Sequence, residues 1–216
     1  SLIMEDNRNL DGPTKNAIEK TEYLVIFLHG WGSDGYDLIQ LADYWQSDLK
    51  KATFLAPNAP EVCSANENGK QWFDILTEDK SKVYYGLEKA YKDLQIYINK
   101  QLIQYNLDFN KYFLVGFSQG AMLALHSSVR NKCLGVIGYS GGFIDYKVPE
   151  KFINNHTLLL HGKADSVVPV ERMYHAKETL KKFLVDVETL EYDNLEHSIN
   201  EEGLKAGASF IKNYVL

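Results

Sequence analysis

Short runs of β-branched and aromatic residues alternate along this chain with longer stretches in which apolar residues recur at three- and four-residue steps. The first pattern is typical of buried strands, and the second is typical of helices with one apolar face. The expected strands cover residues 22–28, 53–56, 112–117, 134–139, 157–160 and 185–192. The expected helices cover residues 36–49, 83–105, 119–131, 170–183 and 199–214.

This alternation predicts an α/β fold with a mainly parallel sheet and helices on both faces. No internal repeat or Gly/Ser-rich linker divides the sequence, so we expect a single domain over residues 1–216, with residues 1–21 as an N-terminal segment. Whether Ser1 to Ile3, which precede Met4, are native stays open. Ligands of such folds bind beyond the carboxyl ends of the strands. The longest irregular stretch, residues 57–81, follows one of these ends and is therefore a candidate functional loop.

Two Gly-x-Ser-x-Gly motifs follow expected strands, GFSQG around Ser118 and GYSGG around Ser140. A serine in this motif acts as a nucleophile when a sharp strand-to-helix turn exposes its hydroxyl, with small neighbours that let helix and strand approach closely. Good helix formers follow Ser118, whereas two glycines and Pro149 discourage a long helix after Ser140. We therefore expect Ser118 to be the nucleophile and Ser140 to be a small residue at a neighbouring strand end.

A serine hydroxyl needs a base to take its proton and a third group to orient that base. With the serine on such a turn, the acid and then the histidine follow it along the chain. His197 lies in the loop after the last expected strand and can reach over the strand ends, which the positions of the other five histidines do not favour. Asp165, in LLLHGKADSVVP, is the expected acid and Asp193 its local competitor. The alternatives are that Asp165 only forms a turn and that His197 is only a surface histidine.

The oxyanion of the tetrahedral intermediate needs two preorganised donors. We expect the backbone N–H of Gln119, directly after the nucleophile, and that of Trp31, in the loop after an early strand. The same loop, LHGWGSDG, spells Gly-x-Gly-x-x-Gly between a strand and a helix, which is the layout of a dinucleotide site. Such a site needs an acid near the end of the next strand, and TFLAPNAP contains none. A dinucleotide-binding oxidoreductase and a noncatalytic binding protein are therefore the weaker alternatives.

Composition narrows the classes of partner. The net charge of −6 is spread in ones and twos, which argues against a nucleic-acid or anionic-membrane surface. The longest purely apolar run, Tyr23–Leu28, is far shorter than the ~20 residues that span a bilayer. Residues 5–20 lack the layout of a signal peptide, so we expect a cytoplasmic protein without integral membrane association. Cys63 and Cys133 are expected to be free thiols, with a disulfide as the alternative.

Six segments in order resemble one known family: FLHGWGSDG, APNAPE, QWFDI, GFSQGAMLAL, LLLHGKADSVVP, and EHS before a terminal helix. Together, from about residue 22 to the C-terminus, they resemble the phospholipase/carboxylesterase family of α/β-hydrolases, which includes acyl-protein thioesterases and small bacterial carboxylesterases. The resemblance implies a catalytic triad of Ser118, Asp165 and His197, and oxyanion donors at Trp31 and Gln119. Relatives often carry Leu or Tyr where Trp31 stands. Only 16 residues separate Ser140 from Thr157, so we expect an α/β-hydrolase fold without a cap domain.

The expected activity is that of a serine carboxylesterase, which hydrolyses short- to medium-chain carboxylic esters through an acyl-enzyme on Ser118, without metal or organic cofactor. Lysophospholipids and acyl thioesters are further candidate substrates, and a main role as an acyl-protein thioesterase is the alternative. The resemblance also implies that the loop carrying Trp72, Phe73 and Ile75 helps to wall the acyl pocket, whereas a core cluster is the other interpretation. Relatives often form homodimers, so a homodimer is possible here.

Overall fold

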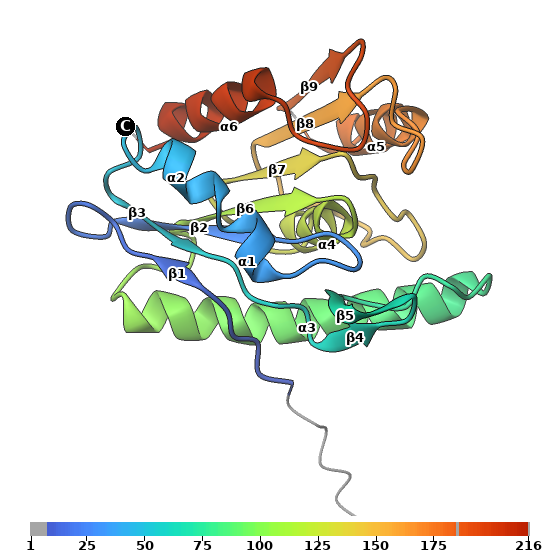
Figure 1. The fold of residues 1–216 in the computed structure, drawn as a ribbon, viewed down its shortest axis with the longest axis horizontal. Helices are drawn as coiled ribbons and strands as arrows, with labels where there is room; N and C mark the ends of the chain where they lie inside the picture. The colour runs from blue at the N-terminus through green and yellow to red at the C-terminus, as the bar shows by residue number, and fades with distance from the viewer. Residues whose placement is uncertain (1–7, 185, 216) are drawn as a thin grey trace, which may run out of the picture.

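A twisted sheet forms the centre of this computed structural model, which describes residues 8–184 and 186–215 (Figure 1). Its strands lie side by side in the order β1 (Thr14–Lys15), β3 (Ala52–Leu55), β2 (Tyr23–Leu28), β6 (Tyr112–Phe117), β7 (Gly135–Tyr139), β8 (Thr157–Gly162) and β9 (Val187–Tyr192). β1 pairs antiparallel with β3, and every other neighbouring pair is parallel. The carboxyl ends of these parallel strands therefore meet at one edge. Ser1 to Ile3 lie outside the described residues.

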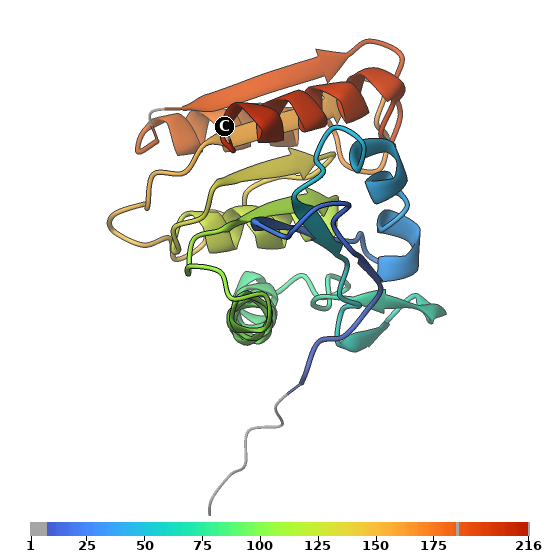
Figure 2. The same cartoon turned by 90° about the vertical axis from the view of Figure 1, so that its left-hand side faces the viewer.

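Two groups of helices cover the two faces of the sheet (Figure 2). α3 (Lys80–Gln104), α4 (Gln119–Ser128) and α5 (Glu171–Lys181) pack on one face, and α1 (Gly35–Leu38), α2 (Leu41–Trp45) and α6 (Glu201–Asn213) on the other. Leu24, Ile26 and Leu28 of β2 contact the first layer, while Val25 and Phe27 contact the second. Strand side chains alternate between the faces, so a strand covered on both sides is apolar throughout. The predicted α/β fold with helices on both faces is confirmed.

Three local expectations differ from the structure. The single helix expected over residues 36–49 is divided into α1 and α2, because the N–H groups of Ala42 and Asp43 bond to carbonyls three residues back, which tightens the chain at the junction. The stretch 57–81 contains a hairpin, β4 (Glu61–Cys63) and β5 (Asn66–Gln71), whose polar sequence hides the usual alternation. β9 begins at Val187, and residue 185, where the expected strand started, lies outside the described residues.

Both cysteines are buried free thiols, so the prediction for Cys63 and Cys133 is confirmed. Over residues 8–184 and 186–215, no helix is both long and apolar enough to cross a bilayer.

A buried histidine joins α3 to α4. His126 is only 2% exposed, and its Nε2 lies 2.5 Å from Oε1 of Glu88 on α3. Burial lowers the pKa of His126 to about 4, with a smaller contribution from Arg130 in the same direction, and this outweighs the opposing effect of Glu88. The folded protein therefore keeps this imidazole neutral at pH values where the unfolded chain protonates it.

We expect the free energy of unfolding to decrease as the pH falls from about 6.5 to about 4, because in this range the unfolded state binds a proton at His126 that the folded state does not. This contribution of the neutral His126 to the free energy of unfolding is fully present above pH 6.5. It amounts to about 3 kcal/mol for the difference between a pKa of 6.5 in the unfolded chain and about 4 in the folded protein. Urea unfolding between pH 7.5 and pH 4.5 measures it. His126→Gln cannot titrate and should show a shallower decrease, so an identical pH dependence in this variant would refute the assignment.

Candidate active site

Ser118 alone forms the turn between β6, which ends at Phe117, and α4, which begins at Gln119. Its backbone has φ 57° and ψ −116°, a combination that residues with a side chain rarely adopt. Such a conformation costs about 1–3 kcal/mol and persists only where the surroundings enforce it. The Ser118 N–H donates to the carbonyl of Tyr139 on the neighbouring strand at 2.8 Å. The turn therefore holds the hydroxyl at the carboxyl edge of the sheet.

The two glycines of the GFSQG motif permit this turn. A Cβ atom on Gly120 would lie 1.9 Å from the carbonyl oxygen of Leu28 in β2, and one on Gly116 would lie 2.3 Å from the carbonyl oxygen of Gly120. Both contacts are with backbone, which cannot move aside. Helix α4 therefore approaches the sheet as closely as the motif led us to expect.

Ser140 shares the unusual backbone of Ser118 but not its context. Its φ is 54°, and it is almost completely buried at the end of β7. Residues 141–156, all of them described, contain no helix or strand. The next residue, Gly141, packs behind the first serine, since a Cβ there would lie 2.8 Å from the carbonyl oxygen of Ser118. Ser140 is thus a neighbour of the Ser118 turn and has no helix of its own.

Asp165 and His197 meet at the same edge, although 31 residues separate them in the sequence. Oδ2 of Asp165 lies 2.8 Å from Nδ1 of His197. Its other oxygen accepts hydrogen bonds from the backbone N–H groups of Val167 and Val168, at 2.9 and 2.8 Å. A carboxylate only accepts, so Nδ1 of His197 donates in this hydrogen bond, and the tautomer with its proton on Nδ1 has Nε2 as the acceptor. This is the orientation that a general base needs.

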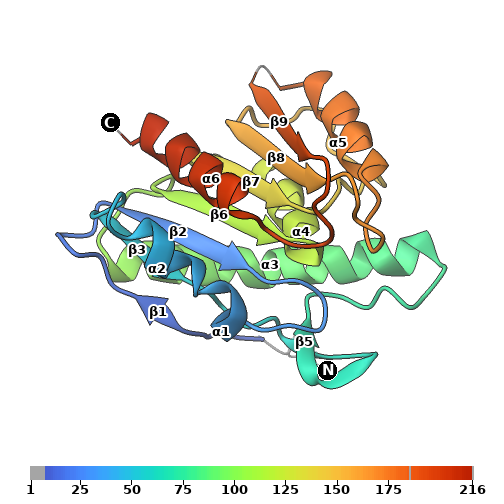
Figure 3. The ribbon, with the colours of Figure 1, turned by 45° about the horizontal axis from the view of Figure 1, so that its top comes forward.

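The imidazole of His197 lies against the strand end that carries Ser118. Its ring centroid is 4.9 Å from that of Phe117, the residue immediately before the serine. Figure 3 shows the loop after β9 bending back along the strand tips toward β6. Asp193, the competing acid, is 81% exposed and pairs with Lys163 at 3.1 Å. Of the two candidate acids, Asp165 is the one that bonds to the imidazole.

The loop after β2 packs directly on the serine turn. A Cβ on Gly30 would lie 3.4 Å from Cβ of Ser118 and 3.2 Å from Cδ1 of Phe117, so the backbone entering Trp31 runs beside the hydroxyl. On its other side, Nε1 of Trp31 donates to Oε1 of Gln71 in β5 at 2.9 Å. The two expected oxyanion donors therefore come from segments that flank Ser118. The helix after this loop, α1, has four residues, too short to provide the helix terminus of a dinucleotide site.

The side chain of Gln119 ties the serine turn to residues 72 and 73. Its Oε1 accepts from the N–H of Trp72, and its Nε2 donates to the carbonyl of Phe73, both at 2.8 Å. The indole of Trp72 in turn donates to the carbonyl of His29 at 2.8 Å. Burial lowers the pKa of His29, and a neutral ring is what the geometry requires, since its Nε2 accepts the N–H of Ala59 at 2.9 Å.

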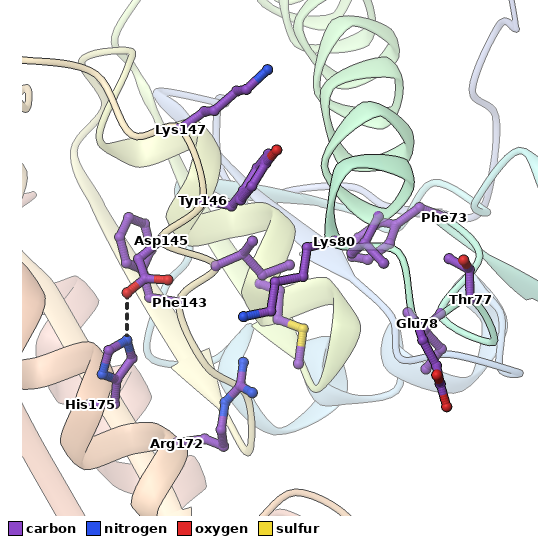
Figure 4. Close-up of a pocket in the computed structure, with 14 residues that line it drawn as sticks. Phe73, Thr77, Glu78, Lys80, Phe143, Asp145, Tyr146, Lys147, Arg172 and His175 are labelled. Atoms are coloured by element: carbon purple, nitrogen blue, oxygen red, sulfur yellow. Dashed lines mark hydrogen bonds and ion pairs between the residues drawn. The ribbon is translucent and has the colours of Figure 1, made fainter.

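A cavity of about 730 Å³ adjoins the first turn of α4 (Figure 4). Of the three residues expected to wall an acyl pocket, Phe73 and Ile75 line this cavity. Trp72 does not line it: its side chain is completely buried in the core and makes the hydrogen bond to His29 described above. Ser118 is not among the lining residues either, but Met122, one helical turn further along, is. The cavity therefore lies beside the serine turn.

The surroundings of Ser118 are thus those of a serine hydrolase, and comparison with known proteins agrees. A family model described as phospholipase/carboxylesterase matches residues 13–215. The chain belongs to this family. It is 32% identical to acyl-protein thioesterase 1 of Saccharomyces cerevisiae, with 90% of this chain and 94% of the relative covered. The crystal structure of esterase PE8 is 33% identical and superposes with a TM-score of 0.87, covering 96% of this chain and all of that one.

A less similar solved structure shares the fold. The structure of acyl-protein thioesterase 2 of Zea mays is 21% identical and has a TM-score of 0.74, with 94% of this chain and 97% of that chain covered. The α/β-hydrolase fold expected from the sequence motifs is therefore confirmed for this member of the phospholipase/carboxylesterase family. Within the described ranges, no three His, Cys, Asp or Glu side chains are grouped so that they could hold a metal ion.

Sequence reasoning did not find two supporting side chains of this family member. It considered only the backbone N–H of Gln119, although a glutamine at the start of an otherwise apolar helix could have suggested a buried polar contact. It also set His161 aside with the other four histidines that are not favoured as the base. His161 is 1% exposed, and its Nε2 donates to the carbonyl of Val168 at 2.7 Å and lies 3.5 Å from Oδ2 of Asp165. It thus supports the loop that carries the acid.

Replacing Gln119 with leucine should destabilise the protein by about 2–5 kcal/mol, because two buried backbone groups at residues 72 and 73 lose their partners. The backbone N–H at position 119 is retained, so we expect KM for a neutral ester to increase more than kcat decreases. Urea unfolding and steady-state kinetics measure the two effects. Gln95→Leu is a matched control, since it removes a glutamine that bonds to Ser127 between α3 and α4. If Gln95→Leu changed the stability and KM as much as Gln119→Leu, the proposed role of the Gln119 side chain in linking the serine turn to residues 72 and 73 would be contradicted.

Proposed function

We propose that this chain hydrolyses carboxylic esters and thioesters through an acyl-enzyme on Ser118, with His197 as general base and Asp165 as the group that orients it. The observation that carries the proposal is the strained Ser118 turn, at the same sheet edge where Asp165 bonds to Nδ1 of His197 at 2.8 Å. The names of its relatives, acyl-protein thioesterase and esterase, support the same class of reaction.

In the first half of the reaction, Nε2 of His197 takes the proton of the Ser118 hydroxyl while Oγ attacks the carbonyl carbon. The negative charge that develops on the substrate oxygen is stabilised by the N–H groups of Trp31 and Gln119. The carboxylate of Asp165 stabilises the positive imidazolium and keeps its orientation. When the tetrahedral intermediate collapses, the imidazolium returns its proton to the leaving alcohol or thiol, and the acyl group stays on Oγ.

In the second half, water takes the place of the alcohol. Nε2 of His197 accepts a proton from this water as its oxygen attacks the acyl carbonyl, and the same two N–H groups stabilise the second tetrahedral intermediate. Collapse of this intermediate breaks the bond to Ser118 Oγ, which recovers its proton from the imidazolium. The products are the carboxylic acid and the free enzyme, and every proton transfer passes through one ring nitrogen.

The experiment that tests this function is a series of p-nitrophenyl esters from acetate to palmitate, assayed below and above micelle formation. We expect kcat/KM to peak at short to medium chain lengths and to show no increase at the micellar transition. A buried CH₂ contributes about 0.8 kcal/mol, but a long alkyl chain would also displace water from charged side chains that share the cavity, such as Lys80 and Arg172. A steep rise toward palmitate would contradict this expectation, and no turnover of any ester would overturn the proposed function.

A main role as an acyl-protein thioesterase is the second candidate, and it rests on the 32% identity with acyl-protein thioesterase 1 of Saccharomyces cerevisiae. It is distinguished by comparing an S-octanoyl cysteine peptide with the same octanoyl group on a small thiol. A much higher kcat/KM for the peptide would favour this role, and equal values would favour a general esterase. The expected cytoplasmic location and homodimer stay predictions, and light scattering of the purified protein measures the oligomeric state.

A further inference from the structure

Two cationic side chains, Lys80 and Arg172, enter the cavity beside α4 from different helices. Lys80 is the first residue of α3, and Arg172 is the second residue of α5. Figure 4 shows their charged ends pointing toward each other. Among the ion pairs formed by the described residues, neither side chain takes part. We call these two residues the cationic pair. Like charges repel, so an anion placed between them would be attracted by both.

The other charged groups that line the cavity form no ion pair with Lys80 or Arg172. Oδ2 of Asp145 pairs with Nε2 of His175 at 3.0 Å. The ammonium group of Lys147 lies 5.5–5.7 Å from the centroids of three tyrosine rings, a distance typical of cation–π contacts. Figure 4 shows the carboxylate of Glu78 directed away from the cationic pair. Within the described part of the chain, the anion that would complete this arrangement is therefore not provided by the cavity itself.

The cationic pair is connected to the reacting serine through short contacts. A Cβ on Gly142 would lie 3.2 Å from Nε of Arg172, so the guanidinium rests on the segment that begins beside the carbonyl of Ser118. Phe73 also lines the cavity, and its carbonyl accepts a hydrogen bond from Gln119. Met122 and other apolar residues line the same cavity. An acyl group on Ser118 that enters it would meet both apolar surface and the cationic pair.

We propose that the cationic pair binds a carboxylate at the far end of the acyl group, so that the favoured substrates are monoesters or monothioesters of short dicarboxylic acids. This rests on the proposed function and deepens it. The methylene groups of such an acyl chain contact the apolar wall, and the terminal carboxylate accepts charge-assisted hydrogen bonds from the Arg172 guanidinium and the Lys80 ammonium. A neutral acyl chain of the same length has no anionic group for the two cations to bind. The pair therefore selects among substrates without taking part in the proton transfers.

The test compares p-nitrophenyl hydrogen adipate with p-nitrophenyl hexanoate, two esters whose acyl chains have the same number of carbons. We expect kcat/KM to be about tenfold higher for the adipate, the size of one charge-assisted hydrogen bond in a partly exposed site. Arg172→Gln and Lys80→Gln should each lower the adipate-to-hexanoate ratio about fivefold. Because both esters are measured on the same variant, a general loss of activity cancels. Lys147→Gln is the matched control and should keep the wild-type ratio, since this ammonium is engaged with tyrosine rings.

Three outcomes would overturn the proposal: a wild-type preference for hexanoate, a preference for adipate that survives in both glutamine variants, or an equal loss in Lys147→Gln. 4-Carboxyphenyl hexanoate carries its charge on the leaving group, and a preference for this ester that depends on Arg172 would place the cationic pair on the alcohol side instead. Fluorophosphonate labelling distinguishes a failure of the cationic-pair proposal from a failure of the proposed function. A protein that labels at Ser118 and hydrolyses hexanoate without selectivity refutes only the cationic pair, whereas one that neither labels nor hydrolyses refutes the catalytic assignment.

Discussion

Replacing Ser118 with alanine should lower kcat on p-nitrophenyl hexanoate by about 10⁴- to 10⁶-fold, since the members of a triad act as a unit and only oxyanion binding remains. The fold should persist, because the methyl group fits wherever the serine Cβ already lies and the N–H of residue 118 still bonds to Tyr139. Treatment with a fluorophosphonate followed by intact-mass measurement should add one adduct to the wild-type protein and none to the variant. Peptide mapping should locate the adduct on Ser118.

Ser140→Ala is the matched control for this result. Ser140 also follows a buried strand and also has a positive φ, 54°, so its replacement has a comparable effect on the backbone. No helix follows it and its side chain is almost completely buried, and we therefore expect Ser140→Ala to keep both labelling and turnover. An adduct on Ser140, or full activity in Ser118→Ala, would mean that the other motif carries the chemistry.

His197→Ala should be nearly as inactive as Ser118→Ala, because without the imidazole no group in the proposed mechanism takes the hydroxyl proton. The kcat of Asp165→Asn should decrease less, by about 10⁴-fold, and this variant should still fold. The asparagine amide can present its NH₂ group to Nδ1, which favours the ring tautomer with the proton on Nε2 and removes the acceptor needed for catalysis. Steady-state kinetics with urea unfolding on the same samples separates loss of chemistry from loss of fold.

Asp193→Asn serves as the control for the acid. It lies four residues before His197 and was the local alternative in the sequence, but its side chain is exposed and pairs with Lys163. Exposed ion pairs contribute little, so this substitution should change neither stability nor kcat appreciably. A larger loss in Asp193→Asn than in Asp165→Asn would show that the orienting carboxylate has been assigned to the wrong residue.

Much of the fold could be predicted because its determinants are local. The apolar run ahead of GFSQG predicts β6, the small residues after it predict a close helix, and the structure shows β6 over Tyr112–Phe117 and α4 from Gln119. Ser118, Asp165 and His197 also each follow an expected strand in the sequence. Parallel strands bring their carboxyl ends to one edge of the sheet, so the three residues are expected to meet there. The strand before Ser118 and the order of the three residues along the chain can therefore be recognised in the sequence without knowing any contact between distant segments.

The remaining features depend on contacts between distant segments, which no local pattern encodes. A polar hairpin strand such as Asn66–Gln71 has no apolar alternation and forms against a neighbour. Trp72, an aromatic residue in a loop, could equally line a pocket or fill the core, and only its bonds to Gln119 and His29 placed it in the core. The sequence favoured Asp165 over Asp193, but only the three-dimensional positions show which carboxylate bonds to His197. Sequence determined which residue types could perform the chemistry, and tertiary structure decided which of them meet, because hydrogen bonds and ion pairs require matching positions a few ångströms apart.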